Sequence, residues 1–170
     1  MKVEADVRLA VAQDVVGIGN VARRTWKDTY TGIILPENQK RFLERWYASA
    51  ALEEAIGQDN SWLYVAVVEG RVIGFAQFVI RESRRGELTR IYVLPEWQRQ
   101  GVGSRLLGEG VAILSAHGVE EVFAHVEKDN AKGIAFYERQ GFCRGREFSM
   151  DMPEQDLELV EYARLIDIGH

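Results

Sequence analysis

A loop with two glycines carries the strongest chemical signal in the chain. It follows the apolar run 87–94 and Pro95, contains Gly101 and Gly103, and leads directly into a helical pattern. The first amides of a helix have no intrahelical acceptor, and the helix dipole favours an anion beside them. Glycine lets the backbone approach a phosphate with no side chain in between. The loop therefore predicts a diphosphate-binding cradle. Its residues are Gln98, Arg99, Gln100, Gly101, Val102, Gly103 and Ser104.

Two common phosphate-binding motifs do not fit this loop. A Walker loop ends in Lys-[Ser/Thr], which is absent here. The dinucleotide fingerprint needs a glycine or alanine where Leu106 stands, and it follows the first strand of its domain, whereas this loop lies mid-chain. Arg99 and Arg105 add positive charge beside the glycines. The spacing alone leaves two interpretations open: a phosphate site, and a strand-to-helix turn that uses glycine for close packing.

Two motifs in the correct order resemble one known family. The order Pro95-x-x-Gln98-x-x-Gly101-x-Gly103 resembles the acetyl-CoA-binding signature of the GCN5-related N-acetyltransferase (GNAT) family. Downstream, the run 130–142 resembles a second motif of that family, which begins with asparagine, contains a tyrosine and ends in Gly-Phe. The resemblance implies that acetyl-CoA is the ligand of the cradle and the donor of an acetyl group.

The elements that would position these motifs also match the family. The resemblance covers residues 1 to about 165 and implies a mixed α/β (α+β) fold. In that fold a mostly antiparallel sheet is flanked by about four helices, and strands 4 and 5 splay apart around the cofactor. Periodicity and turn residues predict strands and helices in a compatible order. The strands are predicted at 7–10, 62–68, 71–80, 87–94, 121–126, 142–150 and 158–165, and the helices at 14–25, 36–56 with a break near 48–51, 101–117 and 130–140.

Composition limits the class of protein. The chain has 170 residues, of which 46% are hydrophobic and 28% charged, so we expect one globular domain over residues 1–170. A formal net charge of −5 argues against a nucleic-acid partner. The single cysteine and the lack of zinc-type spacing predict no metal site. No apolar run is long enough to span a membrane, and residues 1–6 lack the apolar core of a signal peptide, so we expect a cytoplasmic protein.

The resemblance assigns roles in acetyl transfer to several residues. In the family, the strand before the loop carries a bulge that frees backbone groups to pair with the pantetheine arm, and Ile91, Tyr92 and Val93 occupy those positions. The amide of Ile91 would donate to the thioester oxygen, as an oxyanion-hole donor does. Tyr137 matches the family tyrosine near the sulfur and would act as general acid toward the departing thiolate. Asn130 would cap a helix and contact the pantetheine.

Glu87 is the sequence candidate for the general base. It starts the third predicted strand of the run, at the position of a catalytic glutamate in several family members. A carboxylate there could take the proton of the amine directly or through water. Two alternatives stay open: a solvated glutamate at a strand end, and deprotonation through a water chain. His125 lies on the strand predicted at 121–126 and has no carboxylate partner at recognisable spacing, so no catalytic role is expected for it.

The acceptor side is predicted from aromatic residues near the first helix. The segment around Trp26 and Tyr30 resembles a bacterial and archaeal subgroup that includes polyamine N-acetyltransferases. Aromatic rings can hold a cationic amine, although packing of the helices on the sheet is an equal interpretation. Residues 147–170 contain seven acidic residues and one arginine. They would form an acidic rim that attracts such an amine, or they are ordinary solvated charge.

Together these features predict an N-acetyltransferase that moves an acetyl group from acetyl-CoA to a primary amine by direct attack in a ternary complex. A small amine such as a polyamine is the first choice of acceptor, and a protein N-terminus or lysine is the alternative. A non-catalytic acyl-CoA-binding sensor is the alternative from another class, and the presence of both Tyr137 and Glu87 favours the enzyme. Exposed edge strands in this fold commonly pair, so a homodimer is also expected.

Overall fold

A seven-stranded mixed sheet forms the frame of the molecule, with the strand order β1-β2-β3-β4-β5-β7-β6. A computed structural model describes residues 4–166 of the chain. All neighbouring strands are antiparallel except β4 and β5, which are parallel. The strands are β1 (Asp6–Leu9), β2 (Ser61–Val68), β3 (Arg71–Ile80), β4 (Arg85–Val93), β5 (Glu121–Glu127), β6 (Cys143–Met152) and β7 (Gln155–Leu165). The predicted fold class, a mixed and mostly antiparallel α/β fold, is confirmed.

Five α-helices flank the sheet within residues 4–166, where about four were expected. They are α1 (Val15–Tyr30), α2 (Pro36–Trp46), α3 (Ser49–Gly57), α4 (Val102–Ala116) and α5 (Ala131–Arg139). The region predicted as helical at 36–56, with a break near 48–51, forms two helices. Ala48 is extended, with φ −66° and ψ 150°, so it separates α2 from α3. The ring of Tyr47 is buried beside Phe75, with 5.9 Å between the ring centroids.

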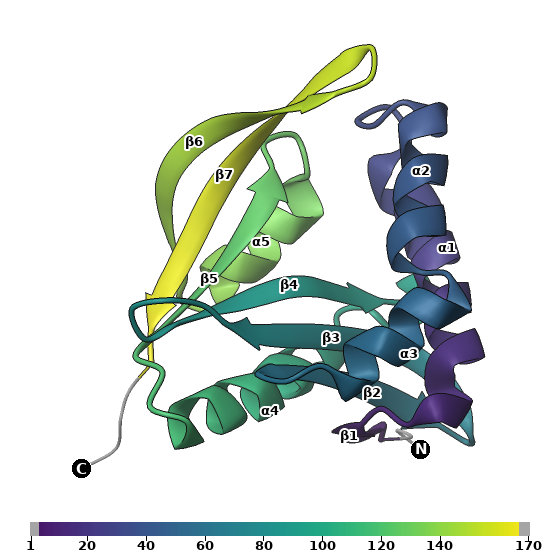
Figure 1. Cartoon of the computed structure of the whole chain (residues 1–170), viewed down its shortest axis with the longest axis vertical. Coiled ribbons are helices and arrows are strands. Elements are labelled where there is room, and N and C mark those ends of the chain that lie inside the picture. Colours follow the sequence, from purple (N-terminus) through teal and green to yellow (C-terminus); the bar gives the residue numbers. More distant parts are fainter. Residues whose placement is uncertain (1–3, 167–170) are drawn as a thin grey trace.

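Opposite faces of β3 pack against different helices. Phe75 faces Tyr47 from the link between α2 and α3, whereas Phe78 faces Gly110 of α4. Successive side chains of a strand alternate between faces, so residues an odd number of positions apart lie on opposite sides of the sheet. Figure 1 shows α4 beneath the strands and α1 and α2 standing at one end of them. The position of α4 matters for function because its N-terminus follows the two-glycine loop.

The parallel pair β4–β5 is short, and the strands then separate. Their register covers only Arg85 with Glu121, Gly86 with Val122, and Glu87 with Phe123. Beyond these pairs, β5, β7 and β6 rise away from β4 (Figure 1). This is the predicted splay of strands 4 and 5. One edge of β4 is therefore free of strand partners from Leu88 onward.

A bulge in β4 lies at the start of this free edge. Gln77 of β3 pairs with Arg90, and the next residue, Phe78, pairs with Leu88, so Thr89 is the additional residue. A bulge bends the strand and turns some of its backbone groups away from the ladder. The bulge implied by the family resemblance is thus present.

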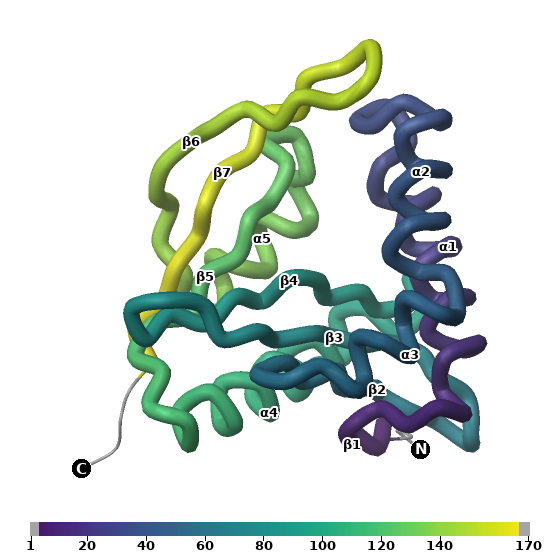
Figure 2. The backbone as a smooth tube through the Cα atoms, in the orientation of Figure 1, coloured from purple at the N-terminus to yellow at the C-terminus, as the bar shows by residue number. Residues whose placement is uncertain are grey.

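The turn between β6 and β7 reaches across to the loop between α1 and α2 (Figure 2). Asn38 donates from Nδ2 to the carbonyl of Pro153 over 3.0 Å. Gln155 donates from Nε2 to the carbonyl of Ile33 over 2.7 Å and accepts from the amide of Leu35 over 3.0 Å. These contacts connect the turn between β6 and β7 to the loop between α1 and α2 and to the start of α2.

Two further findings concern the expectations from composition. No helix in the described residues is long and apolar enough to cross a membrane. Of the acidic residues counted over 147–170, Asp167 lies outside the described residues. The others lie on β6, β7 and their connecting turn.

Two glycines of α4 offer a matched test of its packing on the sheet. A Cβ at Gly110 would lie 2.1 Å from the Phe78 ring, whereas one at exposed Gly108 would meet nothing within 4 Å. Gly110→Ala should lower the free energy of unfolding by about 1–3 kcal/mol through overpacking. Gly108→Ala should raise it by about 0.5–1 kcal/mol through helix propensity. Urea unfolding of both variants measures this, and equal effects would show that α4 does not depend on close approach at Gly110.

Candidate active site

A cleft of about 630 Å³ lies where β4 and β5 separate. Its walls come from β4, the end of β5, the start of α4, α5 and the last turn of α1. The residues that line it include Thr25, Tyr30, Thr89, Ile91, Tyr92, Val93, Gln98, Arg99, Gly101, Gly103, Ser104, His125, Glu127, Asn130, Phe136 and Tyr137. The cleft therefore brings together the two-glycine loop, the free edge of β4 and the second motif.

The start of α4 presents free amides to this cleft. Gly101 adopts a left-handed conformation with φ +82° and caps the helix. The amide of Arg105 makes the first intrahelical bond, 3.1 Å to the carbonyl of Gly101. The amides of Val102, Gly103 and Ser104 precede it, so they have no intrahelical acceptor. A Cβ on Gly101 would meet nothing within 4 Å, so space for a ligand lies beside the amides.

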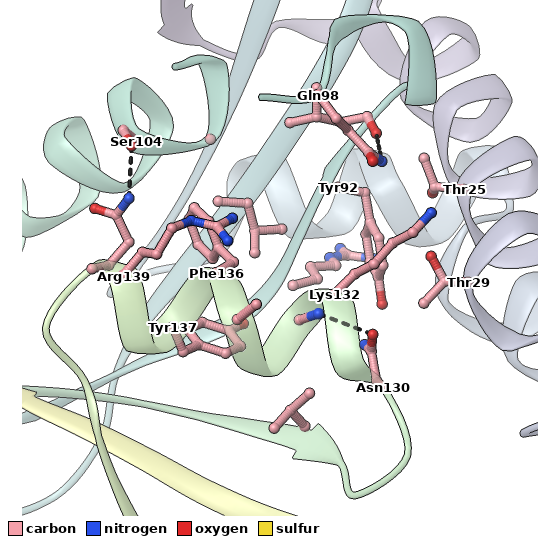
Figure 3. A pocket seen from close by; sticks show the side chains of 18 of the residues that line it. Thr25, Thr29, Tyr92, Gln98, Ser104, Asn130, Lys132, Phe136, Tyr137 and Arg139 are labelled. Carbon is pink, nitrogen blue, oxygen red and sulfur yellow. Dashed lines mark hydrogen bonds between the residues drawn. The ribbon is translucent and has the colours of Figure 1, made fainter. Parts of the chain in front are cut away.

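Neighbouring elements hold the loop in place (Figure 3). Gln98 donates from Nε2 to the carbonyl of Val93 over 2.9 Å, which ties the loop to the end of β4. The hydroxyl of Ser104 accepts from Gln140 over 2.7 Å. A Cβ on Gly103 would approach the Phe136 ring to 3.1 Å, so glycine also allows α4 to lie close to α5. Gly103 therefore serves close packing, whereas Gly101 leaves open space beside the helix-start amides.

The remaining cradle residues take different positions. Arg99 lines the cleft and has a left-handed φ of 61°. Gln100 turns its side chain to the carbonyl of Glu96, over 3.1 Å, and is not part of the cleft wall. Val102 is buried in the core, so only its backbone amide can serve a ligand. These residues fit a diphosphate through backbone donors and the charge of Arg99.

The free edge of β4 forms the floor of the cleft. Ile91, Tyr92 and Val93 all line it, and beyond Glu87 this edge has no partner in β5. An exposed strand edge presents alternating amides and carbonyls that an extended ligand with amide groups can pair with. The donor set thus fits the pantetheine arm implied by the sequence. Asn130 also lines the cleft, and its Oδ1 accepts from the amide of Gly133 over 3.0 Å at the start of α5.

Tyr137 reaches the cleft from α5 and is 7% exposed. Burial raises the pKa of its hydroxyl, and the nearby carboxylates of Glu127 and Glu87 raise it further. A phenol in this state keeps its proton at neutral pH, so it can donate a hydrogen bond to negative charge that develops beside it. Its ring stacks on Tyr162, with 6.2 Å between the centroids and an interplanar angle of 21°. Tyr162 therefore fixes the direction of the Tyr137 ring.

Glu127, at the end of β5, is a site residue that the sequence analysis missed. It lines the cleft, and burial raises the pKa of its carboxyl, although its own backbone amide and the side chains of Tyr30 and Asn130 act in the opposite direction. Strand alternation could have found it, because residues two apart on β5 share a face and both His125 and Glu127 line the cleft. A carboxylate here gives the cleft a place for a cation.

The two predicted aromatic residues of the acceptor side lie at different depths. Tyr30 lines the cleft, and its hydroxyl lies 2.8 Å from that of Tyr92. Burial raises the pKa of both hydroxyls well above the ordinary value, so both stay neutral. Trp26 is 6% exposed and is not part of the cleft wall. It packs behind Tyr30 with 4.5 Å between the ring centroids, which makes it a support for Tyr30 rather than a contact surface.

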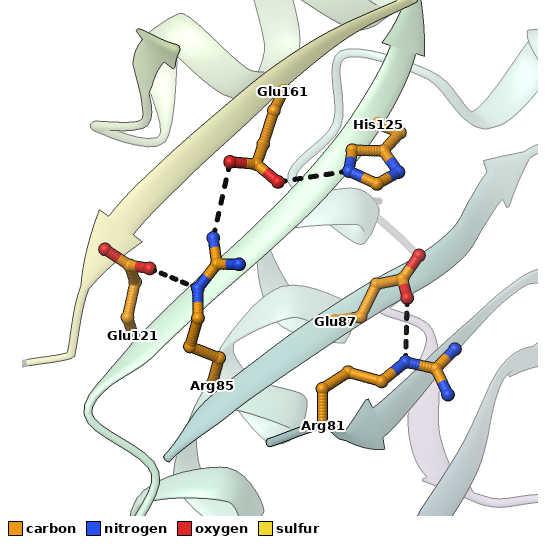
Figure 4. Close-up of polar contacts among 6 residues, drawn as sticks. All are labelled: Arg81, Arg85, Glu87, Glu121, His125 and Glu161. Atoms are coloured by element: carbon orange, nitrogen blue, oxygen red, sulfur yellow. Dashed lines mark hydrogen bonds and ion pairs between the residues drawn. The ribbon is translucent and has the colours of Figure 1, made fainter. Parts of the chain in front are cut away.

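Figure 4 shows Glu87 on β4 and His125 on the neighbouring strand β5. Glu87 accepts from Nε of Arg81 over 2.9 Å and is not part of the cleft wall. His125 is part of the wall, and its Nε2 lies 3.1 Å from Oε1 of Glu161 on β7. The sequence spacing gave no carboxylate partner for His125, but β5 and β7 are neighbours in the sheet and pair His125 with Glu161. The carboxylate partner of His125 is therefore supplied by the sheet and not by a short sequence motif.

Within the described residues, no group of three or more His, Cys, Asp and Glu side chains is arranged to hold a metal ion.

The chain is similar to known acetyltransferases over most of its length. Residues 21–142 match the model of the acetyltransferase (GNAT) family. A spermidine N(1)-acetyltransferase of Thermoplasma acidophilum is 30% identical over 141 residues, which cover 81% of this chain and 87% of that protein. The N-acetyltransferase YuaI of Bacillus subtilis is 35% identical over 141 residues, covering 78% of this chain and 76% of that protein.

A solved structure supports the same relationship. The PaiA N-acetyltransferase of Thermoplasma acidophilum in complex with coenzyme A superposes with a TM-score of 0.79 and 27% identity. The match covers 95% of this chain and 98% of that one. With both sequence motifs lining one cleft, the chain belongs to the acetyltransferase (GNAT) family and is an acetyl-CoA-dependent N-acetyltransferase.

Proposed function

We propose that this enzyme acetylates a small primary amine that carries a second positive charge, with a polyamine as the first choice. The observation that carries the proposal is the carboxylate of Glu127 in the cleft beside the neutral ring of Tyr30. A carboxylate next to an aromatic ring is an environment that attracts an alkylammonium group. Similarity to the spermidine N(1)-acetyltransferase supports the same acceptor class.

The donor side uses backbone groups. The amides at the start of α4, aided by Arg99, hold the diphosphate, and the free edge of β4 at Tyr92 and Val93 aligns the pantetheine arm. Acetyl-CoA supplies the acetyl group as an activated thioester. The amide of Ile91 donates to the carbonyl oxygen, where negative charge develops. Asn130 contacts the arm from the opposite wall.

Tyr137 stabilises the leaving sulfur. Its raised pKa makes the phenol a poor acid in the free enzyme but a persistent hydrogen-bond donor. As charge moves to the sulfur, the hydroxyl donates to it and passes its proton on, and the acceptor nitrogen returns a proton to the phenolate. No covalent acyl-enzyme is needed, since the amine attacks the thioester directly.

The acceptor enters from the side of α1 and the β6–β7 turn. Tyr30 and Glu127 contact the amine, and Trp26 supports Tyr30 from behind. Glu87 lies where β4 and β5 are still paired, and its charge helps to raise the pKa of Tyr137. It is the carboxylate proposed from sequence to take the amine proton. A homodimer, a cytoplasmic location and the absence of a metal remain predictions.

An amine panel tests the proposed acceptor. With acetyl-CoA, release of free thiol should have a kcat/KM for spermidine and spermine at least about tenfold above that for a monoamine of equal length, a gain of roughly 1.4 kcal/mol from the second ammonium group. Glu127→Gln, which keeps the size of the side chain, should reduce this preference mainly through KM. Preference for a peptide N-terminus or lysine would favour the protein-acetylating alternative. Binding of acetyl-CoA without any turnover would favour the sensor.

A matched pair of glycines tests the cradle. Gly101 and Gly118 lie at opposite ends of α4, with φ of +82° and +79°, and a Cβ at either would meet nothing within 4 Å. Gly101→Asp should weaken binding of coenzyme A at least about tenfold, because it places a carboxylate beside the diphosphate. Gly118→Asp should lose similar stability and keep the affinity. Calorimetry that finds equal affinities in the two variants would contradict the cradle.

A pair of tyrosines tests the donor to sulfur. Tyr137→Phe should lower kcat by about 100-fold or more and leave the affinity for acetyl-CoA nearly unchanged, since only the hydroxyl is lost. The control is Tyr162→Phe. The hydroxyl that it removes lies 3.4 Å from both Glu138 and Arg144, and Tyr162 is not part of the cleft wall. Because the pKa of Tyr137 is raised, its hydroxyl stays protonated through mildly alkaline pH, so the rate should show no loss there from its ionisation. Full activity of Tyr137→Phe would remove it from the reaction.

A further inference from the structure

The reaction needs a base near the cleft, and Glu87 is poorly placed for that task. Primary amines are mostly protonated at neutral pH and must lose a proton before they attack a thioester. Glu87 is engaged by Arg81 over 2.9 Å and does not line the cleft. It also belongs to the last residue pair that joins β4 to β5, opposite Phe123. The cleft begins beyond that pair.

His125 is the imidazole that faces this space. It lies on β5 two residues after Phe123, where β4 and β5 have separated, and its side chain is 29% exposed. The rings of Phe123 and Phe148 lie at centroid distances of 5.4 Å and 4.8 Å and limit its rotation. Thr89 and Ile91 of β4 line the same cleft. The ring is thus held in the wall beside the strand whose amide would polarise the acetyl group.

Glu161 fixes the orientation of the imidazole (Figure 4). His125 Nε2 lies 3.1 Å from Oε1 of Glu161, and Arg85 reaches Oε2 over 3.4 Å. Burial opposes ionisation of Glu161, but the bond to His125 and the charge of Arg85 lower the pKa of its carboxyl, so it is an anion at neutral pH. A carboxylate only accepts hydrogen bonds, so neutral His125 must carry its proton on Nε2. The lone pair is then on Nδ1, the nitrogen that points away from Glu161 in Figure 4.

We propose that His125 accepts the amine proton and that Glu161 is its positioning residue. The inference rests on the proposed acetyl transfer to an amine and adds its base. Nδ1 takes one proton from the ammonium group, which gives a neutral amine and an imidazolium that later releases the proton to water. The nitrogen of the neutral amine then forms a bond to the acetyl carbon as the carbon–sulfur bond breaks. The second proton of that nitrogen passes through Tyr137 to the thiolate, so the products are the amide, free coenzyme A thiol and one proton.

Charged groups lie on β5 itself and on the strands around His125. Four of them are acidic and two are basic. They are Glu161 on β7, Arg85 and Glu87 on β4, Arg146 on β6, and Glu121 and Glu127 on β5 itself.

The first test compares two histidines. His125→Gln should lower kcat/KM for the amine at neutral pH by about 100-fold, remove the acid limb of the rate profile, and leave acetyl-CoA affinity unchanged. Part of the rate should return at alkaline pH, where the amine is already neutral. His117→Gln is the control, since His117 lies at the end of α4 against Trp62 and outside the cleft wall. It should match the wild type, and calorimetric binding of acetyl-CoA shows that each variant is folded.

The second test has a readout besides turnover. Glu161→Gln removes the anion that lies against His125 Nε2, so the NMR titration of the His125 ring and the acid limb of the rate profile should both move to lower pH. The titration of His117 should not change. A structural role alone would leave the rate profile in place.

The outcomes separate this inference from the proposed function. If the wild type acetylates amines and His125→Gln keeps both its rate and its acid limb, His125 is not the base. Loss of that limb in Glu87→Gln instead would give the role to Glu87, and the proposed function would stand. If the wild type acetylates no amine, peptide or polyamine, the proposed function falls, and the role of His125 falls with it.

Discussion

The short pairing of β4 with β5 is the constraint on which the site depends. The two strands share only three residue pairs, Arg85–Glu121, Gly86–Val122 and Glu87–Phe123, before they separate. Backbone amides and carbonyls that leave a ladder need other partners. The bulge at Thr89 and the separation of the strands therefore leave one edge of β4 without a partner from β5 in the interior of the sheet. An extended ligand with its own amide groups completes that edge, and the cleft of about 630 Å³ accommodates it.

Charged groups of both signs line the cleft, and its positive side chains include Arg90, Lys132 and Arg139 as well as Arg99. The N-terminus of α4 and Arg99 provide positive potential at one end, which suits phosphates. Carboxylates lie around the cleft as well: Glu127 lines the wall and Glu161 lies behind His125. Tyr30, Tyr92 and Tyr137 also line the cleft, and they stay neutral because burial raises the pKa of each hydroxyl. An anionic donor and a cationic acceptor can thus meet with the thioester between them.

Local sequence signals predicted the backbone structure of the two motifs. Glycine at a left-handed helix cap, asparagine at the start of α5 and the family motifs each depend on residues close together in the chain. The break between α2 and α3 was predicted near 48–51 and lies at Tyr47 and Ala48, where the Tyr47 ring is buried. Trp26 was predicted to contact the acceptor together with Tyr30. An aromatic residue at helical spacing can belong either to the core or to a binding surface, so spacing alone does not separate the two cases. Only the packed structure shows that Tyr30 covers Trp26.

The acceptor side depended on contacts that sequence spacing does not reveal. His125 and Glu161 are 36 positions apart and meet through the pairing of β5 with β7. Glu127 is one charged residue among many until the separation of β4 from β5 places it in the cleft. Register between strands distant in sequence is set by the whole sheet, so short motifs could not supply these partners.

A crystal structure with bound coenzyme A tests whether the start of α4 and the free edge of β4 hold this ligand. We expect the diphosphate within hydrogen-bond distance of the amides of Val102, Gly103 and Ser104, and the pantetheine arm paired with β4 at Ile91 to Val93. Coenzyme A seated elsewhere, or bound with the β4 edge still unpaired, would contradict this expectation.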